Sequence, residues 1–164
     1  MKIKVNEITQ IYDNQYQLIL DFPSIDILYK IVNPNYKYVW IYNHTEIGPS
    51  WNKYNNIKIF DYIVPNVMLR NQTFDILLET TDFIKLIPQI KEHVNLNIIQ
   101  TNKKPPYYIN ANKFMKRDKT WYRLLNSDLE YLFEFEYQND FCPLVSPNRL
   151  FLESVLDYIK RSES

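Results

Sequence analysis

The chain has 164 residues, no formal net charge and a single glycine, Gly48. Phosphate-binding loops, dinucleotide-binding turns and the G-x-S-x-G turn of serine hydrolases each need two or more glycines, so the sequence excludes all three. The length predicts one domain over residues 1–164, and the single cysteine, Cys142, excludes an internal disulfide.

The first half of the sequence is typical of β-strands. Residues 2–10 alternate between apolar and polar side chains, Asp13-Asn14 predicts a turn, and 16–20 is a second strand, which together predict a hairpin. Three further strands, rich in β-branched and aromatic residues, are predicted at 27–32, 36–42 and 57–64. A loop containing Trp51 is expected between the last two of them.

Helical periodicity begins after residue 80. Apolar residues between Phe83 and Val94 recur at helical spacing, with Thr80 or Thr81 as the N-cap and Pro88 as a kink or a new start. A strand at 95–100 is expected to follow.

The last helix is predicted over 147–160. Ser146 is a good N-cap, and Pro147 fits the first helical position, where its missing N–H costs nothing. Val155, Leu156 and Ile159 fall on one apolar stripe, so we expect them in the core.

Residues 126–137 carry two patterns at once. Ser127 and Glu130 have the spacing of a capping box, whereas Phe133, Phe135 and Tyr137 alternate with glutamates as in a strand. A short helical turn followed by a strand satisfies both patterns. The elements together predict an α+β fold, a mostly antiparallel sheet with about two helices packed on one side.

The sequence offers no set of residues suited to catalysis or to metal binding. His44 and His93 lie far apart without a ligand at helical spacing, and Cys142 has no local nucleophile motif. Glu134 and Glu136 share one strand face, but two hydrated neighbouring glutamates would not have their pKa values separated. We therefore expect no catalytic residue, no metal, no cofactor and no enzymatic activity.

The charges separate into two adjacent blocks. Residues 101–125 hold seven basic side chains and one acidic, whereas 126–164 hold eight acidic and three basic. The blocks either pair and neutralise each other or form two separate binding patches. The basic block also contains aromatic residues, which suits single-stranded nucleic acid, although zero net charge makes nucleic acid the weaker expectation.

The predicted function is that of a small cytoplasmic inhibitor of another protein. No apolar leader and no span of 18 apolar residues is present, so a membrane role is not expected. The concrete hypothesis is an immunity protein that neutralises a bacterial toxin, with a nuclease as the example, by occluding its active site. The alternatives are a single-stranded nucleic-acid-binding protein, or a phage or plasmid accessory protein that blocks a host defence complex. The residues predicted to bind the protein partner are Asp128, Glu130, Tyr131, Glu134, Glu136, Tyr137, Asp140 and Trp51.

Overall fold

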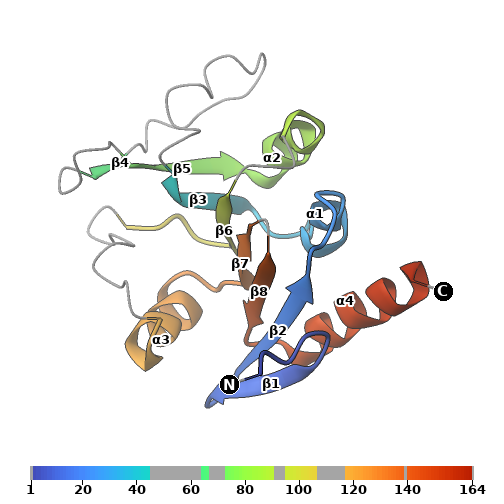
Figure 1. Cartoon of the computed structure of the whole chain (residues 1–164). Helices are drawn as coiled ribbons and strands as arrows, with labels where there is room; N and C mark the ends of the chain where they lie inside the picture. The colour runs from blue at the N-terminus through green and yellow to red at the C-terminus, as the bar shows by residue number, and fades with distance from the viewer. Residues whose placement is uncertain are drawn as a thin grey trace.

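An antiparallel sheet of eight strands forms the framework of the computed structural model, which describes residues 2–44, 64–66, 73–90, 95–106, 117–138 and 140–163. The strands lie in the order β1-β2-β8-β7-β6-β3-β5-β4, so both ends of the chain contribute to one continuous sheet (Figure 1). The strands are β1 (Ile8–Tyr12), β2 (Gln15–Asp21), β3 (Tyr38–His44), β4 (Val64–Asn66), β5 (Thr73–Glu79), β6 (Leu96–Thr101), β7 (Phe133–Tyr137) and β8 (Phe141–Ser146).

Helices cover both faces of this sheet (Figure 1). One face is covered by α1 (Ile27–Ile31), α2 (Thr80–Leu86) with the 3-10 turn Ile87–Gln89, and α4 (Arg149–Ser162). The opposite face is covered by α3 (Lys119–Asp128). The predicted α+β class and antiparallel sheet are confirmed, but the expectation that the helices lie on one side is wrong.

Two hydrophobic cores result, one on each side of the sheet. The alternation in β7 assigns Phe133, Phe135 and Tyr137 to the core beneath α1, α2 and α4. Glu134 of the same strand therefore points toward α3, where the core is built largely from aromatic side chains. The aromatic members of that core are Trp40, Tyr42, Trp121, Tyr122 and Tyr131.

Most of the strands and helices expected from periodicity are present. The hairpin is formed by β1 and β2, and Asn14 in its turn has a φ of 58°. The strands at 36–42 and 95–100 correspond to β3 and β6, and the helix after residue 80 begins at Thr80. Pro88 starts no new α-helix but lies in the 3-10 turn that ends α2. The predicted strand at 57–64 lies outside the described residues except for residue 64, which begins β4.

Two expected elements are wrong. Residues 27–31 form α1 rather than a strand, because Ile27, Leu28 and Ile31 bury one helical face against the sheet. A short apolar run fits both periods, and here the packing decides between them. Ser127 does not cap a helix start, since α3 ends at Asp128 and Glu130 follows with a φ of 48°.

The last helix is present but starts two residues later than expected. Asn148, not Ser146, is its N-cap, and its side-chain Oδ1 accepts a hydrogen bond from the Phe151 N–H at 3.1 Å. Ser146 instead ends β8, where its hydroxyl donates to the Leu132 carbonyl. Val155 is fully buried, whereas Leu156 and Ile159 are only partly buried.

The sequence pattern did not predict α3 or β8. The N-cap of α3 is Asp118, whose carboxylate accepts hydrogen bonds from the Thr120 and Trp121 N–H groups. In β8, Pro143 is unusual for an internal strand, because proline removes a ladder donor. In the sheet, Pro143 pairs with Ile19 of β2, beyond the stretch in which β8 pairs with β7.

Candidate functional site

The predicted acidic segment does not form one surface. Asp128 and Glu130 are exposed where α3 ends, and Asp140 is exposed at the other end of β7. Between them, Glu134 is only 3% exposed, and Glu136 is half-buried on the same strand face. Tyr131 and Tyr137 are also buried, and Trp51 lies outside the described residues. Glu134, Tyr131 and Tyr137 are therefore not available to a partner, which corrects the expectation drawn from their polarity.

The Glu134 carboxylate is held inside the protein by side chains from α3 and the residue that precedes its N-cap. Oε2 accepts a hydrogen bond from the Trp121 indole Nε1 at 2.8 Å and lies 3.5 Å from Nε of Arg117. Oε1 accepts a longer bond, 3.3 Å, from the Tyr122 hydroxyl. Both oxygens therefore have donors, as a buried carboxylate requires.

Arg117 lies between aromatic rings as well as beside Glu134. Its guanidinium carbon is 4.5 Å from the Trp121 ring centroid and 5.0 Å from that of Tyr42. Such contacts are favourable because the face of an aromatic ring is electronegative. Arg117 and Glu134 together fix the start of α3 on the sheet.

Burial raises the pKa of Glu134, and this effect outweighs the attraction of Arg117 and the hydrogen bond from Trp121, which lower it. A raised carboxyl pKa inside a protein is a common mark of a functional site. In this protein, however, both oxygens of the Glu134 carboxylate already contact either a side chain of α3 or the side chain of Arg117, which precedes α3. The arrangement suits a structural ion pair that positions α3.

Replacing Glu134 by glutamine is expected to change how stability depends on pH. Because the pKa of Glu134 is raised in the folded state above its ordinary value of 4.5, the folded state binds this proton more tightly. The resulting stabilisation of the folded state is fully present below the ordinary pKa of 4.5. It is lost as the pH rises through the raised pKa of the folded state. Urea unfolding from about pH 4 to about pH 8 should show the parent losing stability relative to Glu134→Gln. A constant difference would mean that burial and the attraction of Arg117 cancel, and a change in the opposite direction would mean that the attraction dominates.

The two charge blocks partly neutralise each other. Lys103 forms an ion pair with Glu130 at 2.9 Å, and Arg117 pairs with Glu134, so each block contributes to both contacts. The first pair is about half exposed and adds little to stability. The alternative of a wholly separate basic patch therefore loses two of its cations to the acidic block.

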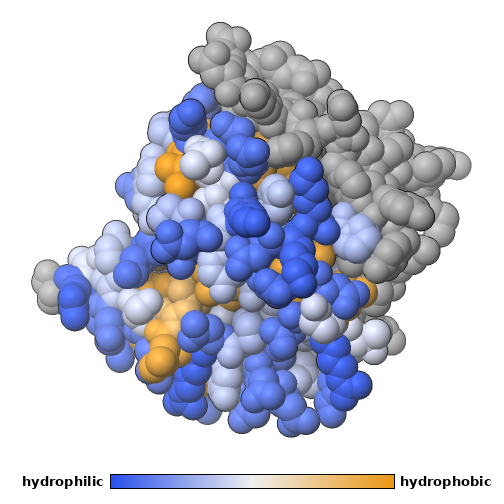
Figure 2. Space-filling model, turned by 180° about the vertical axis from the view of Figure 1, so that it is seen from behind, coloured by the Kyte–Doolittle hydropathy of each residue, from blue (hydrophilic) through white to orange (hydrophobic). Residues whose placement is uncertain are grey.

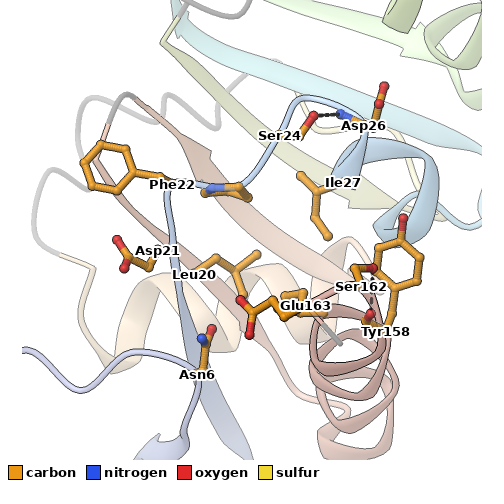
Figure 3. Close-up of a pocket in the computed structure, with 12 residues that line it drawn as sticks. Asn6, Leu20, Asp21, Phe22, Ser24, Asp26, Ile27, Tyr158, Ser162 and Glu163 are labelled. Carbon is orange, nitrogen blue, oxygen red and sulfur yellow. Dashed lines mark hydrogen bonds between the residues drawn. The ribbon is translucent and has the colours of Figure 1, made fainter.

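A cavity of about 320 Å³ opens at the end of β2, between the segment that leads into α1 and the last turn of α4. Its apolar lining comes from Leu20 and Ile27, both labelled in Figure 3, and from Ile159. Tyr158 and Phe22 contribute aromatic side chains that are 42% and 66% exposed. Seen from behind, the described surface is mostly hydrophilic, and hydrophobic side chains reach it in separate patches (Figure 2). The cavity thus combines exposed aromatic rings with an apolar lining, as protein-binding sites do.

Phe22 is held in an unfavourable backbone conformation. Its φ is 44°, in the left-handed region that costs a residue with a side chain roughly 1–2 kcal/mol. Its ring points away from the other residues drawn in Figure 3 and lies 6.5 Å from the ring of Phe141. Strain of this kind persists where the surrounding structure imposes it and is often found at functional sites.

The charged residues that line the cavity are acidic. Asp21, Asp26 and Glu163 contribute carboxylates, and no lysine, arginine or histidine is among the described residues that line it. In Figure 3, Asp21 and Glu163 lie around Leu20, whereas the carboxylate of Asp26 points away from the cavity. Asp140 belongs to the same end of the sheet, because Phe141, the next residue, pairs with Asp21. One residue of the predicted acidic segment therefore lies close to this cavity.

No pattern of neighbouring residues in the sequence predicts this site. Asp21 and Glu163 are separated by almost the whole chain, and only the sheet brings β2 and α4 together. The local signal was the Asp21-Phe22-Pro23 sequence after an apolar strand, since proline marks the end of the strand there.

Other residues considered for chemistry do not form a second site. Cys142 is buried, and burial raises its thiol pKa, which makes the thiolate less accessible. His93 lies outside the described residues, as does the side chain of His44. Within the described part of the chain, histidine, cysteine and carboxylate side chains nowhere gather in the groups of three that a metal ion needs.

Neither the lengths of the helices nor comparisons with known proteins assign this chain to a family. None of the described helices is both long enough and apolar enough to cross a bilayer. A search of protein-family models, of curated proteins and of solved structures finds no match to this chain.

Proposed function

We propose that the protein is a small cytoplasmic inhibitor that binds another protein, most concretely an immunity protein that neutralises a bacterial toxin. The observation that carries the proposal is the cavity beside Phe22, where exposed aromatic rings and an apolar lining adjoin the carboxylates of Asp21 and Glu163. Large aromatic side chains supply most of the affinity in many protein interfaces, and charges around them set specificity and association rate.

The proposed mechanism is occlusion of a basic active site. A toxin that acts on nucleic acid presents a positively charged cleft, which exposed carboxylates can fill in place of phosphates. The acidic groups we assign to this role are Asp21, Asp140 and Glu163 rather than the β7 face with Glu134. The single-stranded nucleic-acid alternative gains no comparable support from the described residues, because Lys103 and Arg117 of the basic block are paired with acidic residues.

The experiment is a growth assay with the genes that flank the gene for this chain. Each flanking gene is expressed from an inducible promoter, first alone and then together with this protein. We expect one flanking product to arrest growth, and co-expression to restore it by forming a complex of equal stoichiometry. The proposal is wrong if no flanking product arrests growth, or if the arrest persists although both proteins are made.

Phe22→Gly is expected to weaken partner binding without destabilising the fold. Glycine relieves the left-handed strain at this position, which offsets its own entropic cost of roughly 0.5–1 kcal/mol. We therefore expect the free energy of unfolding to change by less than about 1 kcal/mol, and partner affinity to fall about tenfold or more because an aromatic anchor is lost. Leu150→Ala, which removes another exposed apolar side chain, serves as the control and should leave both unchanged. Unchanged affinity in Phe22→Gly would remove Phe22 from the interface.

A further inference from the structure

We propose that the cavity between β2 and α4 receives one arginine side chain of the partner protein, an inference that rests on the proposed function. The occupant follows from the chemistry of the walls. The apolar lining, Leu20, Ile27 and Ile159, suits the aliphatic stem of a long basic side chain. Asp21 and Glu163 also line the cavity, on opposite sides of Leu20 in Figure 3, and a guanidinium has several N–H donors with which to bind a carboxylate.

The end of α4 strengthens the attraction for a cation. Tyr158, Ile159 and Ser162 line the cavity from the last turn of this 14-residue helix, where the macrodipole places partial negative charge. Glu163 is the C-cap, a position at which a carboxylate is electrostatically unfavourable, and Lys160 and Arg161 in the last turn offset part of this negative charge. A bound cation would add to that compensation.

The ring of Tyr158 already contacts a cation in the structure. The ammonium of Lys30 lies 5.9 Å from its centroid, at the distance of a weak cation–π contact. An arginine of the partner can stack on the same aromatic ring more favourably, because its planar guanidinium is less strongly hydrated than an ammonium. Lys30 is then a competitor for the occupant, and its removal should increase affinity for a cationic ligand.

The test uses a small probe, so that it does not depend on knowing the partner. N-acetyl-arginine methylamide is titrated into the full chain while the backbone amide signals are followed by NMR. The uncharged N-acetyl-norleucine methylamide, which keeps the apolar stem, is the matched probe. We expect the arginine probe to shift the signals of Asp21, Phe22 and Glu163 with a dissociation constant on the order of 1 mM, and the norleucine probe to cause no such shift.

Three variant proteins test how the probe is recognised. Asp21→Asn combined with Glu163→Gln should weaken binding of the arginine probe about tenfold or more, since bonds to charged groups are lost. Asp26→Asn is the matched control on the same rim, with its carboxylate pointing away in Figure 3, and should change affinity less than about twofold. Lys30→Met should tighten binding. All four residues are exposed, so the thermal midpoints should match the parent's.

The outcomes separate this inference from the proposed function. Equal binding of the two probes, or full affinity in the Asp21→Asn, Glu163→Gln protein, overturns the arginine site but leaves any growth protection by this protein intact. If the arginine probe shifts none of the signals at the cavity, the arginine site is likewise overturned. Conversely, specific binding of the arginine probe without growth protection supports the site and overturns the immunity function.

Discussion

Glu134→Lys is expected to lower the free energy of unfolding by about 3–5 kcal/mol, because it places a second cation against Arg117 in a buried site. The indole N–H of Trp121 would at the same time lose its acceptor. Glu136→Lys is the matched control on the same strand face, and because Glu136 is half-buried and acts on Arg117 and Glu134 only through charge we expect a smaller loss than for Glu134→Lys. Urea unfolding followed by circular dichroism measures both variants.

Similar losses for the two lysine variants would contradict the internal role of Glu134. The expected contrast also corrects the interpretation from the sequence that both glutamates lie on a hydrated strand face. Because Glu134 is 3% exposed and ion-paired, a loss of partner binding after its replacement by lysine could not be told apart from unfolding. Partner binding must therefore be tested with exposed residues.

Leu152→Ala is expected to cost about 2–5 kcal/mol through the cavity it leaves between α4 and the sheet. Leu152 is fully buried, whereas Leu156, which the apolar stripe also placed in the core, is only partly buried. Leu156→Ala should cost less, because part of its side chain is already exposed to water. The midpoints of urea unfolding for the two variants give the comparison, and a larger loss for Leu156→Ala would contradict the packing of α4.

Long periodic segments were predictable from the sequence, and the choice of sheet face was not. The apolar stripe of α4 and the alternation in β7 depend on neighbouring residues, so the sequence identified both elements. Whether the second face of β7 meets solvent depends on α3, which packs on the sheet through Trp121 and Arg117. Glu134, which alternates with phenylalanines along β7, was interpreted as solvent-exposed. The polarity of a residue does not by itself indicate that a helix covers the second face of the sheet.

Short elements and the cavity depended on contacts distant in the sequence. The five residues of α1 fit a strand or a helix equally well, and only burial against the sheet selects the helix. The cavity joins Asp21 with Glu163, which no local pattern connects. The predicted acidic character of the binding surface survives as a proposal, but its residues have moved from the centre of β7 to the end of β2 and α4.

The proposed interface makes a residue-level distinction between two ends of the molecule. Asp21 and Glu163 adjoin the cavity, whereas Asp128 and Glu130 are equally acidic and exposed where α3 ends. Reversing either pair to lysine changes the net charge by the same amount, so long-range attraction to a basic partner is reduced equally. A difference in equilibrium affinity between the two variants then reports contact.

The most direct measurement is the dissociation constant, by isothermal titration calorimetry, of the complex with the growth-arresting partner for both charge-reversed proteins. We predict that Asp21→Lys combined with Glu163→Lys weakens the complex about 100-fold or more, since two carboxylates become cations at a contact surface. Asp128→Lys combined with Glu130→Lys should weaken it less than about tenfold. Equal affinities, or a greater loss in the second protein, would contradict the cavity as the binding site and place the interface at the end of α3.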